Sequence, residues 1–98
     1  MLYLIAYDLE NDSIRQRIAK RLLATGLERI QYSLFIGPLS DTQYAETTEW
    51  LQAQVKKDKK HSLLNIPLHN DMLTAIEHFA TEPLDWEYLA GNKLTMFF

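Results

Sequence analysis

The sequence predicts an α+β domain of the ferredoxin-like βαββαβ kind, with an extra C-terminal strand. Three observations predict this fold class: an apolar strand pattern opens the chain, two amphipathic helix patterns follow it, and strand-like segments lie between the helices and after the second one. The chain has 98 residues, of which 47% are hydrophobic and 23% are charged. This size and composition suit one small globular domain over residues 1–98.

The first strand and the first helix have clear patterns. Residues 2–7, LYLIAY, are apolar on both alternating faces, which is typical of a central strand that is covered from two sides. Residues 12–26 then carry apolar side chains at helical spacing. Ser13 and Gln16 form an S-x-x-Q capping box near the start of this helix, and Gly26 suits a left-handed cap at its end.

A strand region and a second helix come next. Residues 27–40, LERIQYSLFIGPLS, predict either one long bent strand or two short strands with a tight turn near residues 31–33. Ser40 and Gln43 repeat the S-x-x-Q pattern, which predicts the start of a second amphipathic helix over residues 40–57.

The elements that follow are shorter. Residues 61–69 predict a strand, in which Pro67 favours an edge or an end because it has no N–H to donate. Residues 70–80 predict a short helix, and residues 86–90 and 94–98 are two short strand candidates.

The first strand also predicts the oligomeric state. In a βαββαβ fold both helices cover the same face of the sheet, so the other face is left open. Because the first strand is apolar on both faces, something must cover this second face, and we expect it to be another copy of the same sheet. The pattern therefore predicts a two-fold homodimer.

Charge and composition limit the classes of function. The net charge is -3, so the chain as a whole is not the polycation that is typical of nucleic-acid binding, but residues 15–21 and 56–60 each carry four of the ten Lys and Arg residues and allow two local basic patches. The absence of cysteine excludes disulfides and thiolate metal sites. The apolar start has no basic region before it and is too short to span a bilayer, so we expect a cytoplasmic protein with no membrane partner.

Asp8 ends the apolar first strand, and two interpretations of it remain open. An Asp at this position is more often a turn residue than a catalytic one, although Asp12 and Ser13 already serve the helix entry. In a dimer whose two-fold axis passes near Asp8, two carboxylates would meet. They could then share a magnesium ion that activates a water or stabilises the charge that builds on a phosphodiester.

Three stretches of the chain together resemble the small CRISPR-associated adaptation protein of the Cas-two (Cas2) family: LIAYDL at 4–9, the run from 14 to 39, and LLNIPL at 63–68. The family pattern is an apolar strand that ends in Tyr-Asp, a helix with spaced arginines, and then Gly-x-x-Arg-hydrophobic-Gln-x-Ser-hydrophobic-Phe. The matching positions here are Tyr7, Asp8, Arg15, Arg17, Gly26, Arg29, Ile30, Gln31, Ser33, Leu34 and Phe35.

The resemblance implies a ferredoxin-like homodimer in which Asp8 lies near the two-fold axis and binds magnesium together with its symmetry mate. It further implies a metal-dependent endonuclease that acts on RNA or duplex DNA, and a role in spacer acquisition as the subunit that bridges two dimers of the Cas-one integrase. The terminal strand at 94–98 is expected to pack against the partner subunit or the integrase, because it is apolar enough to need cover.

Several further residues are candidates for this site. Arginines and lysines in the two basic segments and at the start of the second strand region suit contacts to phosphates, although solvated surface charges are an equally good interpretation of the arginines. These candidate nucleic-acid contacts are Arg15, Arg17, Arg29, Lys56, Lys57, Lys59 and Lys60. Tyr7, Ser33 and Phe35 are candidate supporting residues, and for Phe35 a place in the core or in the dimer interface is the simpler interpretation.

Three functions remain compatible with the sequence. The first is the CRISPR adaptation subunit, whose nuclease centre is active or vestigial. The second is a stand-alone ribonuclease of the toxin type with the same fold. The third is a dimeric binding module without catalysis, in which Asp8 is only a turn residue.

Overall fold

The computed structural model describes residues 1–82 and 84–89. They form four strands, two long helices and two short helical segments, in an order that confirms the predicted βαββαβ arrangement. The elements are β1 (Leu2–Leu9), α1 (Asp12–Thr25), β2 (Glu28–Gln31), β3 (Leu34–Pro38), α2 (Asp41–Val55), β4 (His61–Leu68), the 3₁₀ helix η1 (Asn70–Ala75) and α3 (Trp86–Leu89).

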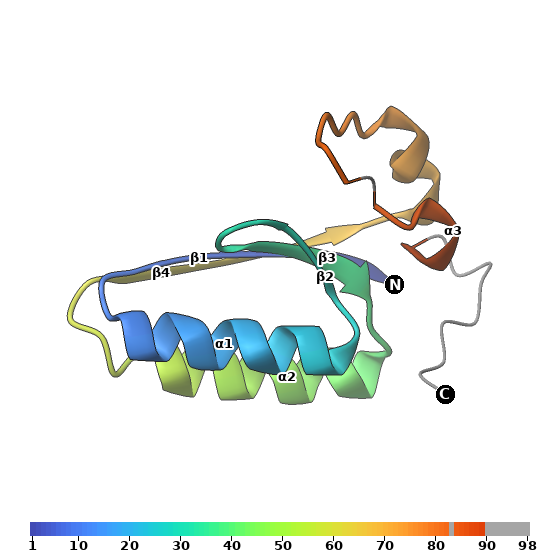
Figure 1. Ribbon diagram of the computed structural model, residues 1–98. Helices are drawn as coiled ribbons and strands as arrows, with labels where there is room; N and C mark the ends of the chain where they lie inside the picture. Colours follow the sequence, from blue (N-terminus) through green and yellow to red (C-terminus); the bar gives the residue numbers. More distant parts are fainter. Residues whose placement is uncertain (83, 90–98) are drawn as a thin grey trace.

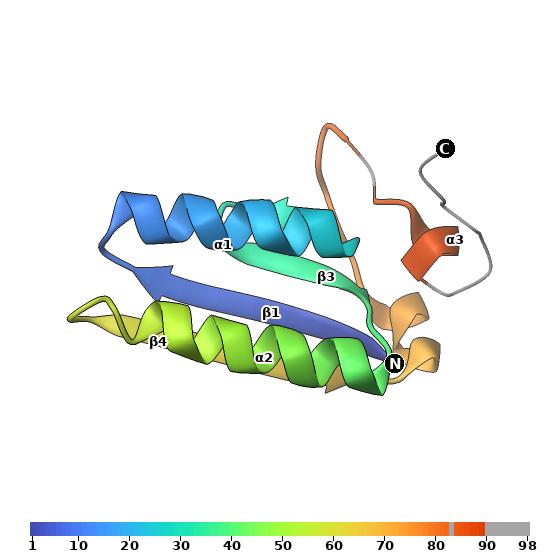
Figure 2. The ribbon, with the colours of Figure 1, turned by 90° about the horizontal axis from the view of Figure 1, so that it is seen from below.

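The strands make one antiparallel sheet in the order β2-β3-β1-β4, and α1 and α2 lie side by side on one of its faces (Figures 1 and 2). β1 is central, as predicted, because it pairs with β3 on one side and with β4 on the other. β4 is an edge strand within the described residues, which agrees with the placement expected from Pro67.

Alternate residues of β1 enter two separate cores. Tyr3, Ile5, Tyr7 and Leu9 point towards the helices and join the main core, which includes the fully buried Ile18, Leu22 and Leu51. Leu2 and Leu4 point to the opposite face, where they join a second cluster. β1 is therefore apolar on both faces because side chains on both faces are buried.

The second face is partly covered by the protein's own chain. Leu73 of η1 and Leu89 of α3 pack with Leu2 and Ile36 over the end of the sheet where β1 begins (Figure 1). The expectation that another copy of the sheet covers this face is therefore incomplete, because the chain itself covers part of it. At the other end of the same face Leu64 is 54% exposed, so residues 1–82 and 84–89 leave this half of the sheet bare.

Two of the three helix caps predicted from the sequence are confirmed. Gly26 ends α1 with a left-handed φ of 103°, and the capping box of Ser40 and Gln43 opens α2. The predicted box of Ser13 and Gln16 is wrong: α1 begins earlier, with Asn11 as its N-cap, and the Asn11 side chain accepts from the Ile14 amide at 2.9 Å. 

The strand region 27–40 is two short strands joined by a turn at Tyr32 and Ser33, so the second of the two alternatives is confirmed. Two other expectations are wrong. The predicted helix at 70–80 is only η1, which ends at Ala75, and the predicted strand at 86–90 is the helix α3. Asp85 explains the helix, since its carboxylate accepts from the Tyr88 amide at 3.1 Å as an N-cap does. The strand predicted at 94–98 lies outside the described residues.

None of the helices over 1–82 and 84–89 is long and apolar enough to cross a membrane.

Candidate metal centre and nucleic-acid interface

Asp8 lies on the bare face of the sheet, at the end away from η1 and α3 (Figure 1). Strand alternation turns its side chain away from the helices, and the register places it directly opposite Ser62 of β4. Asp8 is exposed and lines a shallow pocket of about 300 Å³. The other lining residues are Leu9, Glu10, Lys60, His61 and Ser62.

Asp8 could supply one protein ligand to a metal ion. Within residues 1–82 and 84–89 no group of three or more His, Cys, Asp or Glu side chains could hold a metal ion. Magnesium nevertheless needs only one or two carboxylates, because it keeps several of its waters and takes phosphate oxygens from a substrate. The accessible Asp8 carboxylate fits this requirement as one ligand, and a second carboxylate would come from another copy of the chain.

The loop that follows Asp8 is held by side chains from two other elements. Arg15 of α1 donates from Nη1 to the carbonyl oxygen of Leu9 and forms an ion pair with Asp12. From the connection between α2 and β4, Asp58 Oδ2 accepts from the backbone amides of Glu10 and Asn11, each at 2.8 Å. 

Asp58 was not singled out from the sequence, where it stands in the run KKDKK as one more charged residue. Its side chain is turned inward, and the residue is only 8% exposed. Hydrogen bonds from backbone amides, led by that of Asn11, lower the pKa of the Asp58 carboxyl, although burial acts in the opposite direction. A lone acidic residue inside a lysine run was the signal that could have pointed to an internal partner.

The candidate supporting residues gather beneath the β2–β3 turn. Tyr7 and Phe35 stack with their ring centroids 6.1 Å apart, and both are buried in the main core. Arg29 donates to the carbonyl oxygen of Tyr32 at 3.1 and 2.8 Å, and its guanidinium lies 5.2 Å from the centroid of the Phe35 ring. Burial raises the pKa of Tyr7, and the Arg29 charge and Ser33 act against it. 

These contacts separate the supporting group from Asp8. Tyr7 points to the helix side of the sheet and Asp8 to the bare side, as their alternation along β1 predicted. The simpler interpretation of Phe35 as a core residue is confirmed, because Phe35 is fully buried. Arg29 donates hydrogen bonds to the turn next to it, and Arg15 donates one to the loop after Asp8.

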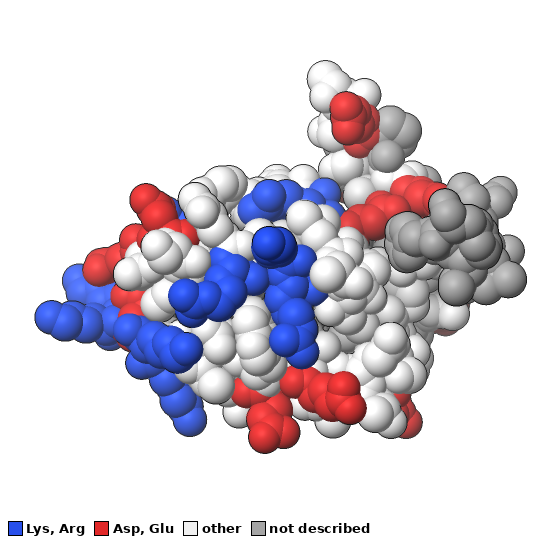
Figure 3. All heavy atoms as spheres, turned by 60° about the horizontal axis from the view of Figure 1, so that its bottom comes forward, with Lys and Arg blue, Asp and Glu red and all other residues white. Residues whose placement is uncertain are grey.

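The fold joins the two basic segments of the sequence. The side-chain oxygen of Gln54, which is buried on α2, accepts from Arg17 at 2.9 Å and from Lys57 at 3.4 Å. Figure 3 shows Lys and Arg side chains gathered over the helix-bearing face and at the end that carries residues 56–60. We call this surface the basic band; its exposed members are Arg17, Lys20, Arg21, Lys56, Lys57, Lys59 and Lys60.

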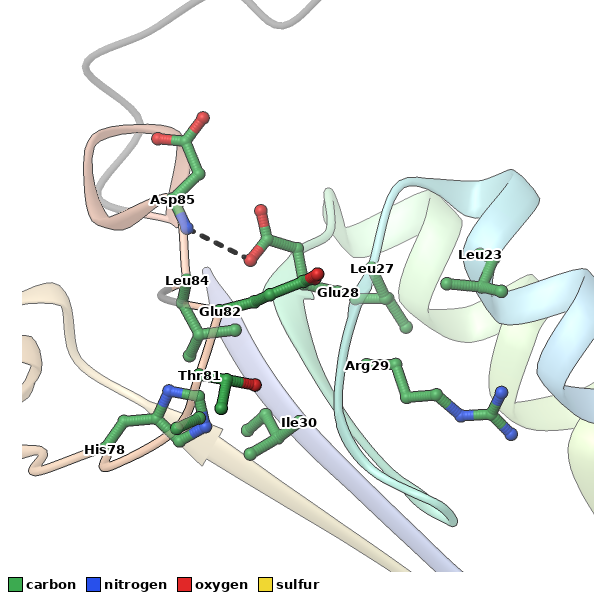
Figure 4. A pocket seen from close by; sticks show the side chains of 11 residues that line it. Leu23, Leu27, Glu28, Arg29, Ile30, His78, Thr81, Glu82, Leu84 and Asp85 are labelled. Carbon is green, nitrogen blue, oxygen red and sulfur yellow. Dashed lines mark hydrogen bonds between the residues drawn. The ribbon is translucent and has the colours of Figure 1, made fainter.

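A larger pocket of about 550 Å³ lies away from Asp8, between β2 and side chains of residues 78–82 and 84–85 (Figure 4). Glu28, Glu82 and Asp85 line it, and the Asp85 amide donates to Glu28 Oε2 at 3.2 Å. Arg29 also lines it but carries its guanidinium away from these carboxylates (Figure 4). Its acidic lining disfavours a phosphate ligand, so this pocket does not belong to the proposed nucleic-acid site.

Comparison with known proteins gives consistent results. Residues 1–76 match the family model described as "CRISPR associated protein Cas2". A CRISPR-associated endoribonuclease Cas2 of Archaeoglobus fulgidus is 41% identical over 71 residues, which cover 69% of this chain and 71% of that protein. A CRISPR-associated endoribonuclease Cas2 of Synechocystis is 34% identical over 83 residues, which cover 85% of this chain and 88% of that protein. A shorter match, to one of Chloroflexus aurantiacus, is 55% identical over 42 residues and covers 43% of this chain and 49% of the relative.

Solved structures show the same fold. The crystal structure of Streptococcus pyogenes Cas2 superposes with a TM-score of 0.71, although it is only 19% identical, and the match covers 82% of this chain and 100% of that one. A hypothetical protein of Thermus thermophilus, TT1823, superposes with a TM-score of 0.68 at 25% identity. The match covers 85% of this chain and 94% of that one. From the family match, the relatives and the shared fold, we conclude that the chain belongs to the CRISPR-associated Cas2 family.

Proposed function

We propose that the protein acts in CRISPR adaptation as a homodimer that binds duplex DNA or RNA and bridges two dimers of the Cas-one integrase, with a magnesium-dependent endonuclease centre at the dimer axis. Membership of the Cas2 family supports the CRISPR role, and the relatives named as endoribonucleases support the nuclease centre. The observation that carries the proposal is the exposed carboxylate of Asp8 on the bare half of the sheet, next to Lys60.

The bare half of the sheet supports the homodimer. Leu64 is 54% exposed, and Ala6, Leu34 and Ile66 are partly exposed on the same face. Soluble proteins rarely leave such contiguous apolar surface uncovered. A second copy packed face to face would bury it, and a two-fold axis near Asp8 would bring the two Asp8 carboxylates together.

Asp8 and its neighbours have distinct roles in the proposed cleavage. A magnesium ion held by the two carboxylates and by water supplies a Lewis acid for water activation and for the charge that develops on the phosphodiester. Lys60 attracts and positions the phosphate backbone beside Asp8. Ser62 lies opposite Asp8 in the register, where its hydroxyl can donate a hydrogen bond to the carboxylate or the substrate.

The test compares two variants that each remove one negative charge. Asp8→Asn should abolish magnesium-dependent cleavage of labelled RNA and duplex DNA while the dimer persists in size-exclusion chromatography. Asp71→Asn, at an exposed position on η1, should cleave like the wild type. If Asp8→Asn cleaves at the wild-type rate, Asp8 is not the metal ligand and the nuclease proposal fails.

A scaffold that binds duplex DNA without cleaving it is the second candidate, and the basic band favours it. Most of the band lies on the helix-bearing face, and its member Lys60 also lines the Asp8 pocket, so DNA could be held along the band whether or not Asp8 is used. Co-purification with the integrase of the same locus tests this function. Wild-type recovery of that complex with Asp8→Asn would show that the scaffold role does not need the metal.

A further inference from the structure

One buried carboxylate ties the loop after Asp8 to the lysine-rich loop. Asp58 Oδ2 accepts from the amides of Glu10 and Asn11, which are 48 and 47 residues away along the chain, and the backbone amides of Lys59 and Lys60 also lower the pKa of this carboxyl. Backbone amides from both loops thus converge on one side chain. Because the bonds are charge-assisted, they are stronger than bonds between neutral groups.

Asp8 itself lacks such support. Within residues 1–82 and 84–89 its carboxylate makes no hydrogen bond and no ion pair. Its position is therefore set by the backbone on either side. On the N-terminal side the β1 ladder fixes this backbone, and on the C-terminal side the bonds at Leu9, Glu10 and Asn11 fix it.

We propose that Asp58 is a positioning residue, which holds the loop after Asp8 so that the Asp8 carboxylate can bind a divalent metal ion. The inference rests on the proposed function, in which Asp8 is the metal ligand. Metal ligands must be held within a few tenths of an ångström, and residues behind the ligands commonly control metal affinity. Here the control passes through the backbone of Glu10 and Asn11 and not through a bond to Asp8.

The contact between Asp58 and the loop after Asp8 also positions the lysine-rich loop. Lys60, two residues after Asp58, lines the Asp8 pocket, and the bonds of Asp58 to Glu10 and Asn11 connect the loop that carries this cation to the loop after Asp8. Metal ligand and phosphate-binding cation are thereby held in one relative position. Four lysines alone would leave this loop solvated and free to move.

Manganese binding tests the proposal without any cleavage assay. Asp58→Asn is nearly isosteric, and its amide oxygen can take the place of Oδ2, but the bonds from Glu10 and Asn11 then lose the negative charge that strengthens them. In calorimetric titration of the dimer with Mn²⁺, we expect the Kd to rise about tenfold. In the control Asp71→Asn, which loses the same charge at a distant exposed site, the Kd should not change.

Amide hydrogen exchange supplies a second readout. In Asp58→Asn the amides of Glu10 and Asn11 should exchange faster than in the wild type, whereas those of the α1 interior should not. If Asp58→Asn does not fold, Asp58→Glu keeps the charge but moves it by one methylene, and it should still weaken Mn²⁺ binding.

Two outcomes would overturn the inference, and they are distinguishable. Wild-type Mn²⁺ affinity in the folded Asp58 variant, alongside metal binding that Asp8→Asn abolishes, removes the role of Asp58 and leaves the proposed function standing. Metal binding that is absent from the wild type, or that Asp8→Asn does not weaken, removes both.

Discussion

Gly26→Ala is expected to destabilise the fold by about 2–3 kcal/mol. Gly26 has a φ of 103°, and an L-residue in the left-handed region costs about 1–2 kcal/mol. A Cβ at this position would lie 2.7 Å from the hydroxyl oxygen of Tyr88, which donates to the Gly26 carbonyl at 2.6 Å. The Tyr88 side chain would swing away, and the loss of its hydrogen bond adds about 1 kcal/mol.

Urea and thermal unfolding measure this effect. For a domain of this size the expected loss lowers the Tm by about 10–20 °C. A double-mutant cycle with Tyr88→Phe separates the two contributions. Because Tyr88→Phe removes both the hydroxyl and the clash, Gly26→Ala should cost only about 1–2 kcal/mol in that background, the backbone part alone.

Two results would refute this reasoning. A loss below about 1 kcal/mol in the wild-type background would mean that the backbone relaxes away from the left-handed conformation. Strict additivity of Gly26→Ala and Tyr88→Phe would mean that the hydroxyl and the new Cβ do not meet.

Three other predictions concern the core, the basic band and the Asp58 carboxylate. Phe35→Ala should cost about 3–5 kcal/mol in urea unfolding, since Phe35 is fully buried, and a loss below about 1 kcal/mol would contradict its place in the core. The affinity for duplex DNA falls with salt concentration, and Lys57→Gln should lower the slope of log K against log salt concentration by about one. An unchanged slope would exclude Lys57 from the interface. The pKa of Asp58 is lower in the folded state than in the unfolded state. The ionised carboxylate therefore contributes fully to the stability of the fold above the unfolded-state pKa, and this contribution is lost as the pH falls through the folded-state pKa. The stability difference between wild type and Asp58→Asn should therefore shrink below about pH 4, and a difference that grows there would contradict the assignment.

Elements that depend on neighbouring residues were predictable from the sequence. The alternation of β1, the capping box of Ser40 and Gln43, and the glycine at the end of α1 each act within a few residues, and all appear as predicted. Asp8 was also placed correctly at the end of β1, because a strand of this pattern fixes the direction of every side chain on it.

The errors arose where a local pattern was too short to decide between two structures and where residues far apart in the sequence are in contact. Asn11 and not Ser13 caps α1, in a loop whose backbone is held by Asp58 from the other end of α2. The four residues of α3 are too few to distinguish helix from strand by periodicity, and the Asp85 cap decides the outcome. Leu73 and Leu89 cover the second face of the sheet through contacts that no local pattern encodes.

The segment over residues 70–82 and 84–89 also limits how two sheets can meet. It occupies the end of the second face where β1 begins, and it rises above the plane of the strands there (Figure 1). In this position the segment would clash with a second sheet, which can therefore pack only against the remaining half of this face. In the proposed homodimer the contact area would then be centred towards the end of β1, and a small overlap, not a full sheet-on-sheet sandwich, would suffice to place the two Asp8 residues on either side of the symmetry axis.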